Sequence, residues 1–351
     1  MSEQSRSDLV LVTGATGFIA MHCIVELLRR GYRVRGTART LRRETGLRQA
    51  LGRHVELGDR FDLVGADLTL DSGWAEAVAD CRYVLHVASP IPRTPPKHED
   101  ELIVPAREGA LRVLRAASKA GVERVVMTSS VAAVLYGRDR SRTFDESDWS
   151  DIDSKKIGAY EKSKTIAERA AWDFVQTLPE GERLELTTIN PGLVLGPLLD
   201  ADWGTSGEAI KKLMERDFPA CPDLGWAPVD VRDVATAHVE AMIRPEAAGE
   251  RFICAIEHAS MRDIAAILDR HLKDRGFRIP TGRLPGFVMR LLALFDKTAR
   301  LALNDLGVRQ DVDNGKIRRV LDWQPRSLET MVTDMADSLI EHGVVEPPKA
   351  A

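Results

Sequence analysis

Two side chains that can exchange protons lie four residues apart in the stretch YEKSK, where Tyr160 is followed by Lys164. In a helix this spacing places both side chains on one face. A phenol, whose pKa is ordinarily about 10, is a poor acid or base at neutral pH. A neighbouring ammonium group favours the phenolate and lowers that pKa. The pair is therefore typical of a site where a tyrosine exchanges a proton with a bound substrate.

A serine that could assist this tyrosine ends an apolar run thirty residues earlier, where RVVMTSS finishes with Ser129 and Ser130. Ligands of a parallel α/β sheet bind beyond the carboxyl ends of its strands, so both serines are expected to face such a crevice. A hydroxyl there can hydrogen-bond a carbonyl oxygen while negative charge develops on that oxygen. We predict that Ser130, Tyr160 and Lys164 are the catalytic residues of a carbonyl reduction in which a nicotinamide supplies the hydride.

A glycine-rich turn near the start of the chain predicts where that nicotinamide cofactor would bind. Its pattern, Gly14-x-x-Gly17-x-x-Ala20, follows the apolar stretch LVLVT and begins a helical one. The first glycine permits a tight turn with positive φ, the second lets the backbone approach a pyrophosphate, and Ala20 lets the helix pack on the sheet. The helix N-terminus then offers free N–H groups to the phosphates. We predict a dinucleotide site, with a turn that binds no ligand as the alternative.

The end of the second expected strand selects between the two nicotinamide dinucleotides. An NAD site usually carries an acidic residue there for the ribose hydroxyls, but no acidic residue occurs between Leu27 and Arg43. The strand is followed instead by Arg39, Arg42 and Arg43. Guanidinium groups match the oxygens of a 2′-phosphate. We predict NADP (NADPH) as the cofactor with Arg39 as the main phosphate contact, and a solvated basic turn is the alternative.

Strand-like and helix-like segments alternate through the first half of the chain, which is typical of βαβ units. The strands are apolar without strict alternation, as expected when helices cover both faces of a parallel sheet. We predict an α/β fold, a Rossmann-type doubly wound parallel sheet with a smaller, discontinuous C-terminal substrate lobe. The expected strands are Leu9–Thr13, Arg33–Ala38, Phe61–Gly65, Tyr83–Ala88, Arg124–Ser129, Leu184–Asn190 and Glu250–Cys254. The expected helices lie near Gly17–Arg30, Asp71–Ala79, Glu99–Ala120 and Ile157–Leu178.

The sequence changes its rhythm after Asn190, where short segments and prolines follow. The later strand-like run Glu250–Cys254 is expected to return to the main sheet. We therefore predict two discontinuous domains. They are an NADP-binding domain of residues 1–194 plus 229–255, and a smaller substrate-binding lobe of residues 195–228 plus 256–351.

Three further features have two readings each. The proline-rich stretch Ser89–Pro105 is either the rim of a pocket or a solvated connector. The acidic stretch DESDWSD (Asp145–Asp151) favours a structural loop over a binding site. A group of large apolar residues in the smaller lobe either lines a substrate pocket or belongs to the core. Its members are Phe218, Trp226, Phe287 and Met289.

The composition excludes several classes of protein. The 351 residues are 44% apolar and 29% charged, with a formal net charge of −4, so no overall basic field attracts nucleic acid. No run of about 18 apolar residues predicts a membrane span, and the polar start MSEQSRSDLV lacks the apolar core of a signal peptide. Cys23, Cys81, Cys221 and Cys254 are widely spaced and form no metal-ligand cluster. We expect reduced thiols, no bound metal and a cytoplasmic location.

The motifs that follow one another along the chain are those of a known family. In order they read TGATGFIA, VRGTAR, GADL, HVASP, TSSVAAV, DESDWSD, YEKSKTIAERAAW, NPGLVLGP, VDVRDVATAHVEAM, RFICA and LDWQPRS. Over nearly its whole length the chain resembles the extended short-chain dehydrogenase/reductases. Within them it is most similar to the group of dihydroflavonol reductases, cinnamoyl-CoA reductases and fungal aldehyde/ketone reductases. The resemblance implies reversible, NADP-dependent reduction of an aldehyde or ketone to an alcohol.

The resemblance also implies roles for residues that match the family's motifs. Ser130, Tyr160 and Lys164 match the catalytic triad, in which Tyr160 donates the proton and Lys164 also binds the ribose. Arg39 matches the arginine that NADP-dependent members place on the 2′-phosphate, and Ser206 lies where some relatives have a serine that contacts the cofactor. The remaining cofactor contacts implied are Gly14, Thr16, Gly17, Phe18, Ile19, Asp67, Leu68, Val87, Ala88, Ser89, Pro191, Gly192, Leu193 and Val194.

Two departures from the family's motifs narrow the expected substrate. Plant flavonoid reductases carry an asparagine where this chain has Leu135. Cinnamoyl-CoA reductases show an NWYCYGK-like stretch where this chain reads IGAYEKSK. The resemblance therefore implies a small-molecule substrate with a hydrophobic or aromatic carbonyl.

Two alternatives stay open. One is an NAD-dependent nucleotide-sugar epimerase or hydroxysteroid dehydrogenase of the same superfamily, against which Arg39 argues. The other is a non-catalytic, NADP-sensing protein on the same fold; such proteins often lose the tyrosine or the lysine, and this chain keeps both. No nucleic-acid or membrane partner is expected, and a homodimer is left open.

Overall fold

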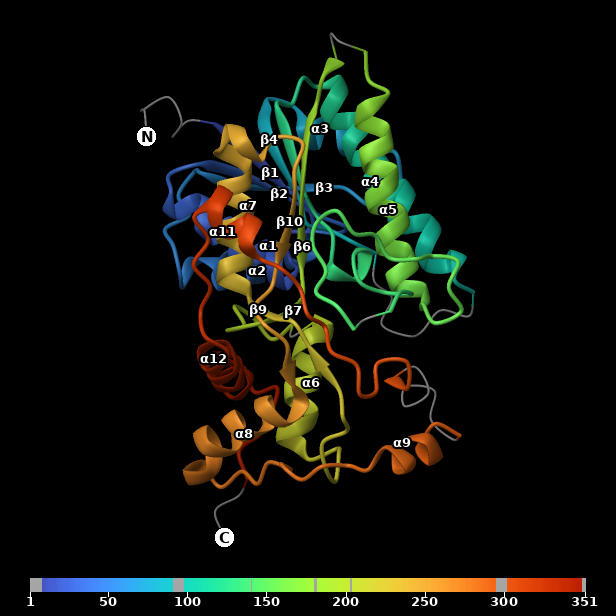
Figure 1. Ribbon diagram of the computed structural model, residues 1–351. Helices are drawn as coiled ribbons and strands as arrows, with labels where there is room; N and C mark the ends of the chain where they lie inside the picture. Colours follow the sequence, from blue (N-terminus) through green and yellow to red (C-terminus); the bar gives the residue numbers. More distant parts are fainter. Residues whose placement is uncertain are drawn as a thin grey trace.

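The protein is built on a sheet between two layers of helices, with a smaller lobe below it (Figure 1). The sheet has seven parallel strands in the order β10-β6-β5-β4-β1-β2-β3. They are β1 (Leu9–Val12), β2 (Arg33–Ala38), β3 (Phe61–Gly65), β4 (Cys81–His86), β5 (Arg124–Thr128), β6 (Glu185–Pro191) and β10 (Arg251–Cys254). The computed structural model describes residues 8–90, 98–139, 141–179, 182–202, 204–294 and 302–348. Residues 91–97 of the proline-rich stretch thus lie outside the described residues.

The strands form where apolar residues can be buried on both faces. All four residues of β1 and all five of β5 are buried, because helices cover both sides of the sheet. Each of the seven expected strands is found with its ends within two residues of the prediction. The direction of strand addition reverses between β1 and β4, and α/β proteins bind their ligands at such a point. The predicted Rossmann-type α/β fold is confirmed.

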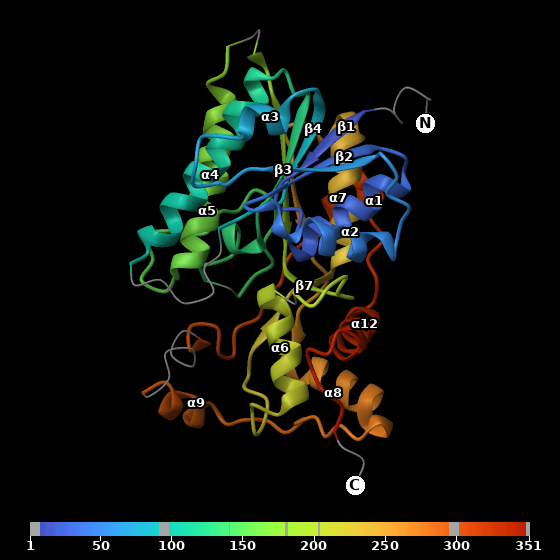
Figure 2. The same cartoon turned by 180° about the vertical axis from the view of Figure 1, so that it is seen from behind.

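Two separate layers of helices cover the sheet. Helices α1, α2, α7 and α11 share one apolar cluster with β1 and β2, and helices α3, α4 and α5 share another on the opposite face. Figure 2, the view from behind, shows the same two layers on either side of the strands. Their bounds are α1 (Phe18–Arg29), α2 (Glu44–Gly52), α3 (Trp74–Val78), α4 (Asp100–Lys119), α5 (Ala159–Gln176), α7 (Val231–Ile243) and α11 (Gly315–Leu321). Short 3₁₀ turns are η2 (Leu41–Arg43), η3 (Val131–Ala133), η5 (Pro245–Ala247) and η6 (Lys273–Arg275).

Helix α2 is present in the structure, although the sequence pattern does not predict it. Its sequence, ETGLRQALG, contains two glycines, and a glycine inside a helix costs up to about 1 kcal/mol relative to alanine. The helix forms because Leu47, Ala50 and Leu51 lie on one face and are buried in the core of the sheet domain. Tertiary packing therefore outweighs the weak local propensity.

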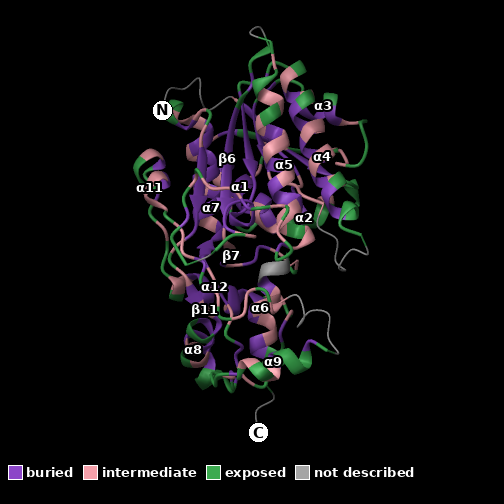
Figure 3. Cartoon of the chain, turned by 45° about the vertical axis from the view of Figure 1, so that its right-hand side comes forward, coloured by how far each residue is buried: buried purple, intermediate pink, exposed green. Residues whose placement is uncertain are grey.

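The smaller lobe has its own apolar core between helices α6, α8 and α12, where Leu213, Leu268 and Met335 are buried. Figure 3 shows buried residues gathered both in the sheet and in this lobe. Strand β7 pairs with β9 in parallel, and β8 pairs with β11 in antiparallel direction. The bounds are β7 (Leu193–Leu195), α6 (Gly204–Glu215), β8 (Gly225–Trp226), β9 (Pro228–Asp230), β11 (Ala259–Ser260), α8 (Met261–Leu272), α9 (Gly286–Leu292) and α12 (Leu328–Glu341).

Helix α11 packs with the sheet although it follows the smaller lobe in the chain. Its Ile317 and Leu321, together with Trp323, are buried in the cluster that α1 and α7 form. Earlier in the chain, β10 returns to the sheet and pairs with β6. The division that assigns residues 195–228 and 256–351 to the smaller lobe stays a prediction. It places α11 in the lobe, although α11 packs on the sheet domain.

The apolar residues considered for a substrate pocket differ in exposure. Met289 is buried, and Phe218 and Trp226 are half-buried against the core of the lobe. Phe287 is 70% exposed. None of the helices in the described ranges is both long and apolar enough to cross a bilayer.

Candidate functional site

The glycine turn between β1 and α1 leaves room for a phosphate group. Gly14 has a φ of +68°, and a Cβ on it would lie 3.0 Å from the Cβ of Ala88. A Cβ on Gly17 would lie 3.2 Å from the Gly14 carbonyl oxygen. Thr16 is half-buried between the two glycines. Larger residues would fill the space that a bound pyrophosphate needs.

The N-terminus of α1 is available to an anion. Gly17 is its N-cap residue, no side chain caps it, and its first turn holds no acidic residue. The Met21 N–H bonds to the Gly17 carbonyl, so the N–H groups of Phe18 and Ile19 lack partners inside the helix. Buried Ala20 lets the helix lie close to the sheet. These features fit the pyrophosphate of a dinucleotide.

Basic side chains gather where β2 ends. Arg39 and Arg42 are exposed, and within the described part of the chain their guanidinium groups form no ion pair or hydrogen bond. Arg43 differs, because it pairs with Asp200 at 3.3 Å and with Asp202 at 3.6 Å. Two guanidinium groups therefore remain available for a phosphate.

Asp67 follows β3 and lies close enough to Arg39 to respond to its charge. The Asp67 carboxylate accepts hydrogen bonds from the Thr69 N–H and hydroxyl, each at 2.8 Å. The N–H bond of Thr69 lowers the pKa of Asp67, and the Arg39 charge lowers it further. The next carbonyl, that of Leu68, accepts from Arg112 at 2.9 Å. The structure thus brings the predicted adenosine contacts Arg39 and Asp67 together.

The segment Val87–Ser89 continues half-buried from the end of β4. The Ala88 N–H donates to Thr13 Oγ1 at 3.0 Å, and the same Oγ1 lies 2.9 Å from His86 Nδ1. Burial lowers the pKa of His86 to about 3, and the charge of Lys164 acts in the same direction. A neutral His86 at the end of β4 is therefore linked by a hydrogen bond to Thr13, which follows β1.

Ser130 and Tyr160 meet near the carboxyl end of β5. The Ser130 hydroxyl accepts from the Ala132 N–H at 3.1 Å as the cap of η3, and it lies close enough to the Tyr160 phenol to affect its pKa. Lys164 lies one turn after Tyr160 on α5. Ser130 and Lys164 are buried, whereas the Tyr160 side chain is 37% exposed. The three predicted catalytic residues are therefore neighbours, and their catalytic roles stay predictions.

Burial has the largest effect on the protonation of these groups. It raises the pKa of Tyr160, the Ser130 hydroxyl opposes this, and the charge of Glu161 adds to it. Burial lowers the pKa of Lys164 to about 8, and the negative charge of Glu168 opposes that shift. The lowered Tyr160 pKa expected from the sequence is thus not found in the protein alone, because burial outweighs the effect of Ser130 and the Lys164 charge is not among the groups that act on Tyr160. Tyr160 is a protonated phenol at neutral pH.

The segment Pro191–Val194 connects β6 to β7 beside Ser130. Its first carbonyl oxygen accepts a hydrogen bond from Ser130 Oγ at 3.4 Å. A Cβ on Gly192 would lie 1.7 Å from the Ala227 carbonyl oxygen, so no side chain fits at this position. The same carbonyl accepts from the Leu193 N–H at 2.9 Å. The structure therefore brings this segment to the same edge of the sheet as Ser130.

Two other positions singled out in the sequence are Ser206 and Leu135. Ser206 lies in α6, and its side chain is outside the described residues. Leu135 is fully buried in an apolar cluster with Val134 and Ile253. In the ranges that the structure describes, no group of three or more His, Cys, Asp or Glu residues could hold a metal ion. The four cysteines are buried and unpaired.

Sequence reasoning missed the buried polar residues behind the site, above all Glu168 and Asn190. The Glu168 carboxylate is fully buried and accepts from Ser129 and Asn190. One signal was available, because Glu168 follows Lys164 by four residues and shares its helix face with Tyr160. The strands that approach this carboxylate could not be inferred from that spacing.

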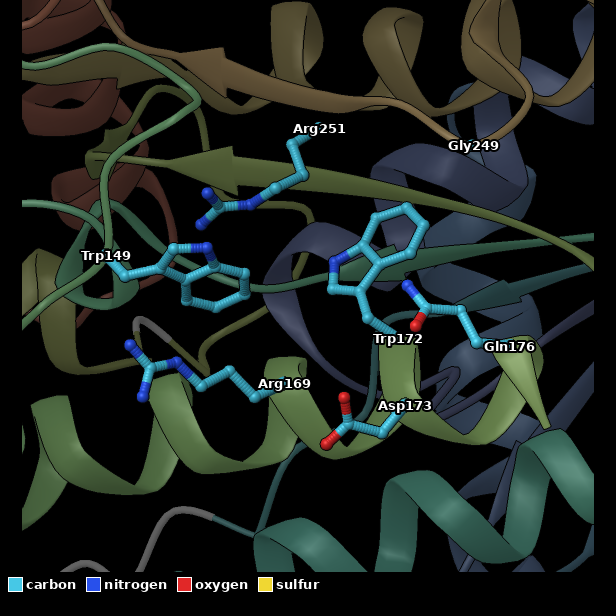
Figure 4. Close-up of a pocket in the computed structure, with 7 residues that line it drawn as sticks. All are labelled: Trp149, Arg169, Trp172, Asp173, Gln176, Gly249 and Arg251. Carbon is cyan, nitrogen blue, oxygen red and sulfur yellow. The ribbon is translucent and has the colours of Figure 1, made fainter.

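A cavity of about 480 Å³ lies beside α5 and the start of β10. In Figure 4 the Trp149 ring lies between two guanidinium groups, 3.8 Å from that of Arg251 and 5.0 Å from that of Arg169. None of the predicted cofactor or catalytic residues lines this cavity, so it is not the site of the predicted chemistry. The lining residues are Trp149, Arg169, Trp172, Asp173, Gln176, Gly249 and Arg251.

Comparisons with known proteins agree with this geometry. Residues 10–255 match the NAD dependent epimerase/dehydratase family. The chain is 32% identical over 351 residues to the NADPH-dependent methylglyoxal reductase of Saccharomyces cerevisiae, covering 95% of this chain and 98% of that protein. It is 37% identical over 280 residues to a cinnamoyl-CoA reductase of Petunia hybrida, covering 78% and 80% of the two chains. The solved structure of yeast methylglyoxal/isovaleraldehyde reductase complexed with NADPH superimposes with a TM-score of 0.78 at 31% identity, covering 96% of this chain and 99% of that one.

Proposed function

Because the chain belongs to the NAD dependent epimerase/dehydratase family, we propose that it is an NADPH-dependent reductase that converts an aldehyde or ketone to an alcohol. The family resemblance recognised from the motifs is confirmed by the match and by the reductases among its relatives. The observation that carries the proposal is that Ser130, at the end of β5, lies beside Tyr160 of α5, one helical turn from Lys164.

The residues at the adenosine end support NADPH over NADH. Arg39 and Arg42 have no ion-pair partner in the described part of the chain, and the stretch between Leu27 and Arg43 lacks an acidic residue for the ribose hydroxyls. The yeast relative is named as NADPH-dependent, and its solved structure holds NADPH. When bound here, NADPH supplies the hydride that the carbonyl carbon accepts.

In this mechanism Tyr160 gives its proton to the carbonyl oxygen as that oxygen becomes negative. Its raised pKa keeps the phenol protonated at neutral pH, which a proton donor requires. The O–H bond of the tyrosine breaks and the O–H bond of the alcohol forms. The resulting phenolate regains a proton from solvent after the alcohol leaves.

Ser130 orients the carbonyl group for this transfer. Its present hydrogen bond to the Pro191 carbonyl is long, at 3.4 Å, so turning the hydroxyl proton toward a substrate oxygen sacrifices little. The Ala132 N–H holds Ser130 Oγ in place at 3.1 Å. A fixed donor is worth more than a mobile one because it need not reorganise as charge develops.

Lys164 holds the charge that makes the phenolate acceptable in a buried site. With a pKa of about 8 it is mostly protonated at pH 7. Its ammonium forms no ion pair or hydrogen bond within the described ranges, so its three donors are available to ribose hydroxyls and to the Tyr160 oxygen. A buried cation near a phenolate lowers the free energy of the charged state.

The substrate that fits best is a hydrophobic or aromatic aldehyde or ketone without a CoA group. The stretch IGAYEKSK departs from the pattern of the cinnamoyl-CoA reductases. Half-buried Phe218 and Trp226 give the smaller lobe an apolar wall. Among the relatives, one is named for methylglyoxal and another for cinnamoyl-CoA.

The proposal is tested by following the oxidation of NADPH and NADH in parallel against aromatic aldehydes, α-keto compounds, bulky ketones and hydroxycinnamoyl thioesters. We expect turnover with NADPH and at least one free carbonyl compound. Tight binding of NADPH without turnover of any of these would overturn it in favour of a cofactor-sensing protein. Purified protein that retains NAD through dialysis would instead favour an epimerase.

Three finer features complete the proposal. The sheet with its cofactor would form one domain and residues 195–228 with most of 256–351 a substrate lobe, as the separate apolar cores support. The reductase would act in the cytoplasm on a small molecule. Light scattering after gel filtration measures whether the chain forms a homodimer.

A further inference from the structure

The buried carboxylate of Glu168 lies at a junction of three strands with the helix that carries the predicted catalytic pair. Glu168 is fully buried on α5, one turn after Lys164 and two turns after Tyr160. From the end of β5, the Ser129 hydroxyl donates to its Oε2 at 2.5 Å. Ser129 immediately precedes Ser130, so this bond acts on the strand end that carries the hydroxyl proposed to orient the carbonyl.

The second strand at this junction is β6. The Asn190 amide donates to Glu168 Oε2 at 2.8 Å and also to the Ser130 carbonyl at 3.1 Å. Thr188 Oγ1 lies 3.1 Å from Glu168 Oε1. One carboxylate therefore connects α5 to the ends of both strands that flank the predicted site.

The third strand is β10, which supplies a positive charge. Arg251 Nε donates to Glu168 Oε1 at 2.6 Å, and the guanidinium is buried against the Trp149 ring. The Trp172 indole N–H reaches the same oxygen at 3.4 Å. Every group on the carboxylate is a donor, an arrangement that the ionised form satisfies.

From this convergence we propose that Glu168 is a positioning residue: its carboxylate keeps Lys164 protonated and holds the ends of β5 and β6 against α5. The catalytic meaning of this role rests on the proposed reductase function, but its electrostatic part does not. A negative charge one turn from a buried ammonium favours the protonated form, and Glu168 raises the pKa of Lys164 against the effect of burial.

The other charged and titratable groups around Lys164 do not reproduce this effect. His86 on β4 is neutral near pH 7 because burial lowers its pKa to about 3. Arg251 is positive, pairs with the Glu168 carboxylate at 2.6 Å and is not among the groups that act on Lys164. On α5, Glu161 raises the pKa of Tyr160 and is not among the groups that act on Lys164. Glu168 is the acidic group that acts on Lys164 in the described structure.

The direct test is a titration of Lys164 by NMR of ¹³Cε-labelled lysine, its resonance being identified by its loss in Lys164→Arg. The full-length chain is used without cofactor or substrate. In the wild type we expect a midpoint near the pKa of about 8, and in Glu168→Gln a midpoint lower by about one unit, because a neutral amide no longer offsets burial. Thr188→Val removes a hydroxyl at the same oxygen without changing charge, so its midpoint should stay that of the wild type.

A kinetic arm links the titration to the proposed reaction. Replacing a carboxylate by an amide lowers the pKa of every nearby group, so the first proton of the coupled Tyr160–Lys164 pair leaves at lower pH. The alkaline fall of kcat/KM for NADPH-dependent reduction should move down by about one pH unit in Glu168→Gln. A purely structural role would lower the rate without moving this limb. Glu168→Asp, which keeps the charge, should restore the wild-type limb.

The outcomes separate the two proposals. A Lys164 midpoint that is the same in folded Glu168→Gln and wild type overturns the role of Glu168, whatever the activity. If the Lys164 midpoint is displaced in Glu168→Gln but the wild-type chain reduces no carbonyl, the electrostatic role of Glu168 is supported and the reductase function is overturned.

Should Glu168→Gln fail to fold, the double variant Glu168→Gln/Arg251→Gln removes both members of the buried ion pair. It leaves neither charge without a partner, which is better tolerated than removing one. The Arg251 charge is not among those that act on Lys164, so the double variant should lower the Lys164 midpoint in the same direction. An unchanged midpoint there overturns the role of Glu168 equally.

Discussion

The Ser130 hydroxyl lies close enough to the Tyr160 phenol to lower the pKa of that phenol, although thirty residues separate the two in the chain. Ser130 follows β5, and Tyr160 lies in the first turn of α5. Both elements are packed in the core: all five residues of β5 are buried, and α5 buries Ala167 and Ala171 in the same apolar cluster. The separation of the two hydroxyls is therefore set by the packing of α5 on the sheet and not by a loop.

Replacing Ser130 by alanine should separate a catalytic from a structural effect. Loss of a fixed hydrogen-bond donor to the carbonyl oxygen should lower kcat by about 10²- to 10³-fold. Loss of the η3 cap, where Ser130 accepts from Ala132, should cost about 1 kcal/mol of stability. Steady-state kinetics measures the fall in kcat, and thermal unfolding measures the loss of stability. Ser260→Ala, which removes the cap of α8, should show the stability loss alone; an equal fall of kcat in both variants would contradict the role of Ser130.

Replacing Arg39 by alanine should weaken the binding of NADPH and leave the binding of NADH unchanged. A charge-assisted hydrogen bond contributes about 1.5 to 3 kcal/mol, so KM for NADPH should rise by about 10- to 100-fold. Arg43→Ala is the matched control, because Arg43 is already paired with Asp200 and Asp202. Steady-state kinetics with both cofactors measure the effect, and a similar rise of KM for NADH would show that Arg39 does not read the 2′-phosphate.

Adding one methyl group at Gly192 should destabilise the chain. The new Cβ would lie 1.7 Å from the Ala227 carbonyl oxygen, and overpacking of this kind costs about 3 kcal/mol when the backbone must shift. Gly46→Ala in α2 meets nothing within 4 Å and should stabilise by up to about 1 kcal/mol. Urea unfolding of both variants gives the comparison. Equal urea midpoints for Gly192→Ala and Gly46→Ala would mean that the β6–β7 segment moves freely enough to accommodate the new methyl group.

Stability should fall as the pH is lowered from 6.5 toward 4. Burial lowers the pKa of His22 and His238 to about 4 and that of His86 to about 3. The unfolded chain binds protons at these groups near pH 6.5 while the folded chain does not, so each group costs stability on the order of 3 kcal/mol by the time the pH reaches its folded pKa. Above pH 6.5 the contribution is fully present. Unfolding free energies measured across this range should show the slope.

Two variants assign that slope to buried histidines. His238 is fixed by Thr128 Oγ1 at 2.6 Å and the Val234 carbonyl at 2.8 Å, and His238→Gln should flatten the slope. His98 is exposed, and His98→Gln should leave it unchanged. Identical slopes in the two variants would mean that other groups cause the acid sensitivity.

The fold and the predicted site can be recognised in the sequence wherever the pattern that indicates them lies within a few neighbouring residues. The turn from Gly14 to Ala20 combines a strand, two glycines and a helix within a dozen residues, and each has a separate physical requirement. The central strands β1, β4 and β5 are recognisable because burial on both faces leaves them mostly apolar. Tyr160 and Lys164 are recognisable because four residues make one helical turn.

The features that the sequence does not predict depend on contacts between segments that are distant in the chain. Helix α2 forms through the burial of Leu47 and Leu51 on the sheet domain in spite of its glycines. Glu168 meets Asn190 and Arg251, which lie 22 and 83 residues further on. No periodicity predicts that three strands direct donors at one carboxylate, because that depends on the order of the strands in the sheet.

The variant Tyr160→Phe shows whether Tyr160 donates the proton in an NADPH-dependent carbonyl reduction. The measurement is the NADPH oxidation rate of wild type and variant at saturating cofactor with the best carbonyl substrate. We expect a fall in kcat of about 10²- to 10⁴-fold, with NADPH affinity, measured by fluorescence titration, unchanged within about twofold. A variant that reduces the carbonyl at the wild-type rate would contradict the account.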